Sequence, residues 1–426
     1  MRVHSVNRST LIFRFYQQSR YSIAALLGAI ETDPRLDSLN VLVPSEAPER
    51  SIQTWLKYGP VTVAYSVMST QAGRIIEEAK NIRSKHGDRV TLIAGGPHAS
   101  ARPWELLEAG FDLVAIGEGE RVFPEIMYRL GNGLDPTGVE GVVSECMEHY
   151  PKPHDLVKIT LDDYPPFALG LNIVGPIEVT RGCPFACKFC CTPFLTGTVV
   201  RHRSVDSVVR WLSLAAQKRH FRRTWFLSPN ALCYGGNGLT SRPEELESLL
   251  SKSASVDGIE EIFFGSFPSE VRPEFANHRI LEILRQYTAN KTLQIGLQSG
   301  SDRVLKIANR RHTVQQGRDA VGMALDAGFI PHVDMIFGLP GEEENDLKAS
   351  LRLCDEMTGM GVRIHAHVFM PLPGSSFEQM PPGRLDEETR KYLGDLARRG
   401  LLTGSWGTQE QFGERLAAGN SDAGSD

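Results

Sequence analysis

The sequence has no long apolar run, no excess of positive charge and no paired pattern of cysteines. No stretch of 18 or more apolar residues occurs, which excludes a membrane-spanning helix. The formal net charge of −5 lacks the basic character of nucleic-acid-binding proteins. Seven cysteines is an odd number, and four of them lie between Cys183 and Cys191, which is the wrong distribution for a disulfide framework. We therefore expect neither a membrane nor a nucleic acid as partner.

The beginning of the chain carries arginines and no acidic residue before Glu31, a composition that transit peptides also have. These arginines are Arg2, Arg8, Arg14 and Arg20. The segment Thr10–Tyr16 instead reads as a strand and Tyr21–Ile30 as the helix after it, and no cleavage-like sequence follows. We expect a cytoplasmic protein, with a transit peptide as the minority interpretation.

Short apolar runs alternate with helical patterns up to about residue 130. After the first strand, the expected strands are Asn40–Val43, Val61–Tyr65, Val90–Ala94 and Phe111–Ile116. One helix between them is expected to be capped by Thr70 and to stop at Gly87, and another to run from Pro103 to Gly110. This alternation predicts a parallel sheet covered on both faces, hence a doubly wound, Rossmann-like α/β domain over residues 1–135. Residues 136–175 are expected to be a linker.

Glycines and small polar residues follow three successive strands of this domain. The runs are Ser66–Thr70, Gly95–His98 and Gly117–Glu120. Ligands of doubly wound sheets bind beyond the carboxyl ends of the strands, where glycines let backbone amides approach closely. The sequence therefore predicts a ligand-binding edge there.

A second series of strands and helices follows. Its expected strands are Ile177–Thr180, Thr224–Leu227, Glu260–Phe264, Thr292–Leu297, His332–Phe337 and Ile364–Phe369. Six such units predict a partial (β/α)6 barrel, TIM-like, over residues 176–385, with its active face at the carboxyl ends of the strands. Residues 386–426 are expected to form a helical extension that ends in a polar tail, AAGNSDAGSD, without a helical pattern.

The first barrel strand leads directly into a loop with the sequence RGCPFACKFCC. Thiolates of Cys183, Cys187 and Cys190 can converge on one inorganic cluster. Zinc is the competitor, but a zinc site usually needs a second pair of ligands, and only His202 is nearby. An iron–sulfur cluster that is held by three cysteines and has one iron without a protein ligand explains this spacing better than zinc does.

The other cysteines are not part of this pattern. Cys191 is ambiguous, because four ligands that included it would strain two adjacent residues around one metal. Cys146, Cys233 and Cys354 stand alone, and a lone cysteine is more often a small buried residue than a nucleophile.

The three-cysteine loop after the first strand of a βα barrel resembles the radical SAM signature. The resemblance implies that the loop holds a 4Fe–4S cluster, that the open iron binds S-adenosylmethionine (SAM), and that reduction cleaves SAM to a radical. Gly296–Ser301, Ile336–Glu342 and Phe369–Gly374 resemble the family's strand-end contact motifs, although many relatives have Glu where Gln298 stands and an acidic motif in place of 226–230. The implied SAM contacts are Phe189, Ser228, Gln298, Ser299, Gly338, Pro340 and Phe369.

A doubly wound domain with the runs GGPHAS and VAIGEGE before such a barrel resembles the cobalamin (B12)-binding, class B radical SAM family. The motif Asp-x-His-x-x-Gly is absent from residues 1–150, so the resemblance implies base-off cobalamin without a histidine from that motif. The implied cobalamin contacts are Ser66, Thr70, Gly95, Gly96, His98, Gly117 and Glu118. Methylthiotransferases place further cysteines in this domain, but here none precedes Cys146, which disfavours sulfur insertion.

The resemblance implies a C-methyltransferase that uses SAM, the 4Fe–4S cluster and methylcobalamin. Alternatives are a cyclase or rearrangement enzyme without methyl transfer, a polar methylation, and a non-catalytic corrinoid-binding or metal-binding module. The expected partners are a small-molecule or peptide substrate and an electron donor such as flavodoxin or ferredoxin.

His365 and His367 are candidates for the substrate cavity of this barrel. They alternate with apolar residues, so both side chains project from one face of the last strand. If that face is inward they border the cavity; a satisfied pair in the core is the alternative.

Overall fold

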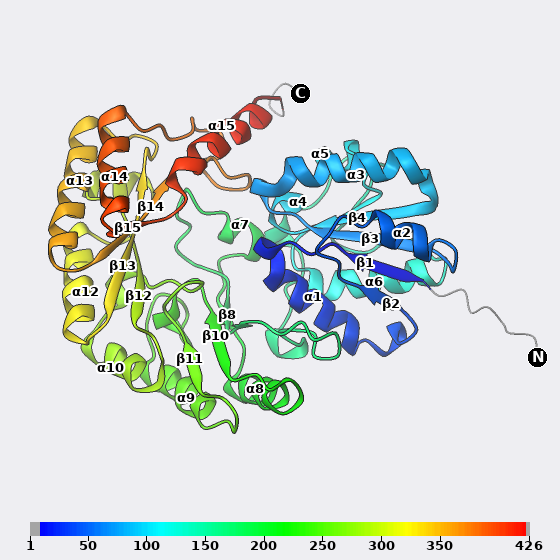
Figure 1. Ribbon diagram of the computed structural model, residues 1–426, viewed down its shortest axis with the longest axis horizontal. Helices are drawn as coiled ribbons and strands as arrows, with labels where there is room; N and C mark the ends of the chain where they lie inside the picture. The colour runs from blue at the N-terminus through cyan, green and yellow to red at the C-terminus, as the bar shows by residue number, and fades with distance from the viewer. Residues whose placement is uncertain (1–8, 423–426) are drawn as a thin grey trace, which may run out of the picture. The chain divides into compact units, whose positions relative to one another are not determined.

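The computed structural model describes residues 9–422, which belong to two compact units. The first unit extends to Gly175 and includes Phe194–Thr196, and the second contains the rest of the chain (Figure 1). Arg2 and Arg8, which bear on the transit-peptide interpretation, lie outside the described residues. No helix within residues 9–422 is long and apolar enough to cross a membrane.

The first unit contains a six-stranded sheet in the order β2-β1-β3-β4-β5-β6. Its strands are β1 (Thr10–Phe13), β2 (Asn40–Leu42), β3 (Val61–Ser66), β4 (Val90–Gly95), β5 (Leu113–Ala115) and β6 (Val142–Val143). All neighbours are parallel except β5 and β6. All five strands expected in this domain are therefore present, and β6 adds an antiparallel edge.

Helices cover both faces of this sheet. They are α1 (Arg20–Thr32), α2 (Glu49–Trp55), α3 (Ala72–His86), α4 (Pro97–Ala101), α5 (Pro103–Glu108) and α6 (Gly119–Gly131). Ile12 of β1 packs in one apolar cluster with residues of α3, whereas its neighbours Leu11 and Phe13 pack in another with residues of α1 and α6. Two cores on opposite faces of one parallel sheet confirm the doubly wound fold.

Two local expectations in this unit need revision. Thr70 does not cap α3, because a 3-10 turn over Ser69–Gln71 precedes the helix, which begins at Ala72 without a side-chain cap. Residues 136–175, expected as a linker, pack within the first unit: they supply β6, and Leu156 and Ala168 join its two apolar clusters.

The second unit contains the parallel strands of a partial barrel, in the orders β7-β10-β11 and β12-β13-β14-β15. The strands are β7 (Ile177–Glu178), β10 (Arg223–Leu227), β11 (Glu261–Phe263), β12 (Thr292–Gln298), β13 (Ile330–Phe337), β14 (Arg363–Val368) and β15 (Leu402–Thr403). A parallel bridge between Val271 and Ile295 links the segment after β11 to β12. All six expected barrel strands are present, and β15 is an unexpected seventh.

The remaining elements of this unit are one small sheet and a set of helices. The sheet pairs β8 (Thr180–Arg181) with β9 (Arg201–His202) in antiparallel orientation. The helices are α7 (Thr192–Thr196), α8 (Val205–Arg219), α9 (Pro243–Ala254), α10 (His278–Tyr287), α11 (Asp302–Ile307), α12 (Val314–Asp326), α13 (Glu344–Gly359), α14 (Glu387–Arg398) and α15 (Trp406–Asp422). The last three residues of α7, Phe194–Thr196, belong to the first unit.

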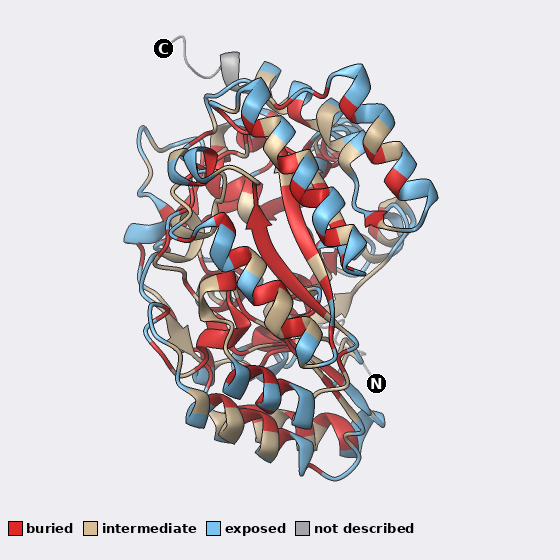
Figure 2. Ribbon diagram, turned by 90° about the vertical axis from the view of Figure 1, so that its left-hand side faces the viewer, coloured by how far each residue is buried: buried red, intermediate tan, exposed pale blue. Residues whose placement is uncertain are grey.

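The strands β12, β13 and β14 have one apolar and one polar face. The apolar face includes Ile295, Val333 and Ile364, each fully buried, and α12 and α13 pack against these strands. Figure 2 shows the buried strands behind helices whose outward stripes are exposed. The opposite face, which the helices leave free, carries Asp334 and His365 and forms the inside of the barrel.

The carboxyl-terminal expectation was partly wrong. The helical extension is present as α14 and α15, but α15 continues to Asp422 and so includes the first part of the segment expected to be an irregular polar tail. The helix packs against β14, and this tertiary contact stabilises a sequence whose composition alone does not predict a helix. Residues 423–426 lie outside the described part of the chain.

Candidate functional site: a cysteine loop on a polar barrel

The backbone of the cysteine loop is held by segments that follow later barrel strands. Gly182 begins the loop at φ 92°, where a Cβ would lie 2.2 Å from the carbonyl oxygen of Val199. The amide of Lys188 donates to the carbonyl of Ala308 at 3.0 Å, and its carbonyl accepts from the amide of Phe377 at 2.9 Å. The loop is therefore fixed by the barrel.

The three predicted cluster ligands lie on this loop without a disulfide. Cys187 is buried, and Cys183 and Cys190 are half-buried. Burial raises the pKa of Cys183, and it raises that of Cys190 to about 12, which favours the protonated thiol at these two positions. A metal that binds these sulfurs must displace their protons and compensate three negative charges.

Two arginines, Arg272 buried and Arg310 half-buried, supply positive charge at Cys187. Nη1 of Arg272 lies 3.6 Å from the Cys187 sulfur, and Nη1 of Arg310 lies 3.5 Å from it. Arg272 also stacks on Phe185, with its guanidinium carbon 3.5 Å from the ring centroid. Three soft sulfur donors with guanidinium donors beside them fit an iron–sulfur cluster, because hydrogen bonds to the sulfurs and local charge stabilise and tune such clusters.

The geometry does not support the zinc alternative that used His202. Its Nε2 lies 2.6 Å from the carbonyl oxygen of Gly236, and its Nδ1 lies 2.9 Å from the hydroxyl of Thr180. Both ring nitrogens are therefore engaged, and neither is available to a metal at the cysteine loop. Cys191 is half-buried at the start of α7, and burial raises its pKa.

The lone cysteines differ from one another. Cys233 and Cys354 are buried, as expected for packing residues. Cys146 is exposed, so the packing role expected for it was wrong. It lies three residues after the short edge strand β6, in a segment that the sheet does not cover.

An apolar cluster joins several of the implied SAM contacts. Phe189 of the cysteine loop packs against a buried cluster that contains Phe369, which follows β14, and Leu339, which follows β13. Val304, Ala308 and Phe377 complete this cluster. An apolar, partly aromatic surface beside the cysteine loop is suited to a planar ring such as adenine.

The segments around Gly338 and Pro340 bring backbone close to backbone. Gly338 has φ 72°, and a Cβ there would lie 2.7 Å from the Cα of Gly383. Its amide donates to Glu342 Oε2 at 2.6 Å. Pro340 is buried. Burial raises the pKa of Glu342 to about 7, although the hydrogen bond from Gly338 acts in the opposite direction.

The end of β12 combines an unusual conformation with a buried turn. Gln298 has φ 82° at an irregularity in the pairing with β13. Ser299 is fully buried, accepts from the amide of Ser301 at 3.2 Å and lies 3.4 Å from the Ser350 hydroxyl on α13. Ser299 therefore joins the strand end to a helix.

Ser228, the candidate after β10, is likewise engaged in a turn. Its hydroxyl donates to the carbonyl of Asn230 at 2.9 Å and accepts from the amide of that residue at 3.2 Å. Its own amide donates to the Ser269 hydroxyl at 2.9 Å, which links the second and third barrel strands.

The glycine-rich edge of the first unit lies where the sequence predicts it. Ser66 is buried and its Oγ has no partner, whereas Thr70 is exposed. Gly95 ends β4. Gly96 has φ 95°, and a Cβ there would lie 2.9 Å from the amide nitrogen of Val67; Gly117 has φ 77°. These conformations keep the edge free of side chains.

Two candidates at this edge are held by protein groups. The ring of His98 is buried, with Nδ1 3.1 Å from the Ser69 hydroxyl and Nε2 3.1 Å from Glu105. Glu118 is also buried and accepts from the amide of Ile159 at 2.9 Å. Because both nitrogens of His98 are engaged, it has no free nitrogen for cobalt.

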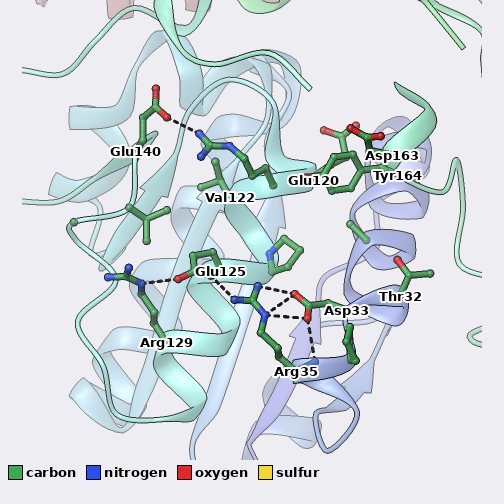
Figure 3. A pocket seen from close by; sticks show the side chains of 16 residues that line it. Thr32, Asp33, Arg35, Glu120, Val122, Glu125, Arg129, Glu140, Asp163 and Tyr164 are labelled. Carbon is green, nitrogen blue, oxygen red and sulfur yellow. Dashed lines mark hydrogen bonds and ion pairs between the residues drawn. The ribbon is translucent and has the colours of Figure 1, made fainter. Parts of the chain in front are cut away.

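A separate surface pocket of about 580 Å³ lies on the first unit between α1 and α6 (Figure 3). Its arginines are paired with acidic neighbours: Arg35 with Asp33 and Glu125, and Arg121 with Glu140. None of the implied cobalamin contacts lines it. Its charges are satisfied within the protein, and we assign it no ligand.

The structure places His365 and His367 on the inner face of the barrel, where Thr403 Oγ1 lies 2.9 Å from His365 Nδ1 and Gln409 Nε2 lies 3.1 Å from His367 Nδ1. Both are half-exposed, while Ile364, Ala366 and Val368 between them are buried on the helix-covered face. The two rings meet edge to face, with centroids 4.6 Å apart. They therefore border the inside of the barrel, where Asp334 lies beside them with its Oδ1 3.7 Å from His367 Nε2.

Sequence reasoning missed several charged residues of this site: Arg272, Arg310, Asp334 and Glu270. A signal for Asp334 exists, because it alternates with apolar residues in the run HVDMIF, as an inward polar residue would. Glu270 and Arg272 lie in the loop after β11, and Arg310 lies between α11 and α12, where the local pattern gives no direction for a side chain.

Comparison with known protein families agrees with this architecture. The model of the radical SAM superfamily matches residues 177–354, and the model of the B12 binding domain matches residues 21–127. The chain therefore contains a radical SAM domain, which a B12 binding domain precedes. The cofactors expected from the sequence are those of these two families.

The fold is also that of solved radical SAM enzymes with cobalamin. The radical SAM methyltransferase TsrM from Kitasatospora setae, solved with cobalamin and a [4Fe–4S] cluster, aligns with a TM-score of 0.67 at 14% identity, over 88% of this chain and 78% of TsrM. The cobalamin-dependent radical enzyme OxsB aligns with a TM-score of 0.65 at 17% identity, over 82% of this chain and 52% of OxsB.

A relative in sequence is an uncharacterized protein of Methanopyrus kandleri. It is 24% identical, and the match covers 79% of this chain and 71% of that protein.

Proposed function

We propose that this radical SAM protein is a cobalamin-dependent C-methyltransferase. The observation that carries the proposal is the fixed three-cysteine loop, with Arg272 and Arg310 at Cys187, in a chain that also has a B12 binding domain. The likeness of the whole fold to TsrM, which is described as a methyltransferase, supports methyl transfer over other radical reactions.

In this proposal the residues of the chain bind and orient the cofactors. Cys183, Cys187 and Cys190 ligate a 4Fe–4S cluster, and the apolar cluster around Phe189 holds the adenine of SAM. The glycine edge of the first unit, from Ser66 to Glu118, binds cobalamin in its base-off form. When bound, these cofactors supply reductive cleavage of SAM and a transferable methyl group.

The residues implied as SAM contacts fall into two groups, those expected to touch SAM and those that position a neighbouring segment. Backbone at Gly338 and Pro340 and the side chain of Gln298 lie at strand ends where SAM is expected, and Phe369 adds apolar surface. Ser228 and Ser299 act as positioning residues, since their hydroxyls are engaged within turns. We expect flavodoxin or ferredoxin as the electron donor.

The first prediction concerns the cluster. Replacing Cys187 by Ala removes one of three ligands, so the Cys187→Ala protein should lose most of its iron after anaerobic reconstitution and should form no 5′-deoxyadenosine with dithionite and SAM. Cys146→Ala is the matched control, because Cys146 is exposed and outside the loop, and it should retain both properties. Cleavage of SAM by Cys187→Ala at the wild-type rate would contradict the cluster assignment.

Methyl-labelled SAM separates methyl transfer from the second candidate. A C-methyltransferase transfers the label to cobalamin and then to product. A radical cyclase or rearrangement enzyme forms 5′-deoxyadenosine but an unlabelled product; OxsB, which has a similar fold, is described as a cobalamin-dependent radical enzyme without mention of methyl transfer. Label that reaches cobalamin and never a product would overturn methyl transfer.

The substrate is proposed to be a small molecule or a peptide. The similar structure of TsrM with tryptophan substrate and a SAM analogue bound supports a small molecule. Screening amino acids and short peptides for stimulation of 5′-deoxyadenosine formation tests this class directly.

A further inference from the structure

Among residues 9–422, two carboxylates inside the barrel form no ion pair with a lysine or an arginine, although Asp334 Oδ1 lies 3.7 Å from His367 Nε2. Glu270, after β11, is exposed toward the interior, and Asp334 on β13 is only 3% exposed. Asp334 Oδ1 accepts from Gln294 Nε2 at 2.5 Å, but its buried Oδ2 has no partner. A buried carboxylate oxygen without a donor is costly, so this face is incomplete without a further group.

The nearest arginines direct their donors elsewhere. Arg310 donates to the Cys187 sulfur, to the carbonyl of Gly296 and to Nε2 of His312. Arg272 pairs with Glu274, with Nε 2.7 Å from Oε1, and also faces Cys187. Their charge serves the cysteine loop and their own partners, which leaves Glu270 and Asp334 as the acidic part of the interior.

A metal ion is the first ligand to consider, because ligand atoms of Asp334, His365 and His367 lie within 4.8 Å of one another. The hydrogen bonds of Gln409 oppose it. The amide of Val368 donates to Gln409 Oε1 at 3.0 Å, so Gln409 Nε2 must donate to His367 Nδ1, 3.1 Å away. The proton of neutral His367 then sits on Nε2 and faces Asp334, where a metal would need a lone pair.

A ligand with N–H donors and positive charge satisfies the same groups without that conflict. We propose that Glu270 and Asp334 form the receptor for an ammonium group inside the barrel. The proposal deepens the proposed function, on which it rests. An ammonium group offers three donors, enough for Glu270 and for the free oxygen of Asp334.

The pKa of Glu270 beside Asp334 is in line with a binding site for a cation. Glu270 is exposed but lies among protein atoms of the barrel interior, with Oε2 3.6 Å from where a Cβ on Gly296, the neighbour of Asp334 in the sheet, would lie. The resulting loss of solvation and the charge of Asp334 raise the pKa of Glu270 to about 7, whereas Arg310 and His367 act to lower it. An ammonium group at this position would favour both ionised carboxylates. The group could belong to the substrate or to the methionyl part of SAM, and binding experiments distinguish these sources.

The test compares one charged and one neutral probe on the reconstituted full chain. Titration of thermal stability with n-butylammonium should give saturable stabilisation that n-butanol does not give. Glu270→Gln and Asp334→Asn should each weaken the apparent affinity for n-butylammonium at least tenfold. Glu270→Gln changes an exposed side chain, so its result does not depend on whether Asp334→Asn folds well. Asp326→Asn, an exposed position on α12, is the charge-matched control and should bind as the wild type does.

SAM binding, measured by equilibrium dialysis, identifies the source. Unchanged SAM affinity in Glu270→Gln assigns the receptor to a substrate amine, and a tenfold loss assigns it to the SAM ammonium. Three results would overturn the proposal. They are equal stabilisation by n-butylammonium and n-butanol, wild-type affinity for n-butylammonium in both Glu270→Gln and Asp334→Asn, and stoichiometric zinc binding that Asp334→Asn abolishes. Because n-butylammonium binding is read without turnover, absence of 5′-deoxyadenosine formation would contradict the proposed function and not the receptor.

Discussion

At the scale of single residues, the site depends on positions that tolerate no side chain. Gly96 and Gly117 keep the strand ends of the first unit open, and Gly182 and Gly338 let loops of the second unit approach other backbone. The sequence predicted glycine-rich strand ends, but the spacing to neighbouring atoms depends on residues far along the chain. For Gly182 the obstructing atom belongs to Val199.

A matched pair of glycine substitutions tests this requirement. Gly96→Ala should lower the free energy of unfolding of the first unit by about 1–3 kcal/mol, because φ is 95° and the Cβ would lie 2.9 Å from Val67 N. Gly73→Ala on α3 has no atom within 4 Å and should be neutral or stabilising by up to about 1 kcal/mol. Urea unfolding followed by circular dichroism measures both. An equal effect of the two substitutions would contradict the strain assigned to Gly96.

At the scale of elements, strands with continuous apolar runs were predictable and short or polar elements were not. The strand β13 was found from its pattern, whereas β15 has two residues and no pattern of its own. The last part of α15 has a polar composition that does not predict a helix, and the helix to which it belongs packs against β14. Gln409 is central to this docking, because it bonds both the backbone and a side chain of β14.

Substitution of Gln409 tests the contact between α15 and β14. Gln409→Leu leaves the buried amide of Val368 without an acceptor, which should cost about 1–3 kcal/mol of unfolding free energy. Gln409→Glu restores the acceptor and should recover most of this loss. Gln411→Leu, at an exposed position of the same helix, is the control and should change stability little. Thermal and urea unfolding provide the measurement, and equal stability of Gln409→Leu and Gln411→Leu would exclude this role.

At the scale of the whole molecule, each unit has its own core and its own part of the chemistry. The first has two apolar clusters on opposite faces of its sheet, and the second has a helix-covered apolar face and a polar interior. Charged groups in such an interior make stability depend on pH. Glu342 provides a clear case, because burial raises its pKa to about 7.

The direction in which stability changes with pH follows from the pKa of Glu342 in the folded and in the unfolded chain. Its folded pKa is about 7, above the value of about 4.3 for an unfolded chain, so its contribution to stability is full below about pH 4.3 and is lost as pH rises through 7. Between about pH 5 and 8 the wild type should lose about 2–3 kcal/mol of unfolding free energy relative to Glu342→Gln. Glu282→Gln, at an exposed position, should follow the wild type. Parallel pH profiles for wild type and Glu342→Gln, from urea unfolding, would refute the assignment.

The sequence by itself determined the class of the chain. The spacing of Cys183, Cys187 and Cys190 and the alternation of apolar strands with helices are local patterns, and local patterns carry ligand spacing and the direction of side chains along one strand. Only the tertiary structure decided which charges meet. Arg310 reaches Cys187 across 123 positions of the chain, and Gln294 reaches Asp334 across 40. Such contacts depend on how separate strands and loops pack, which no local pattern contains.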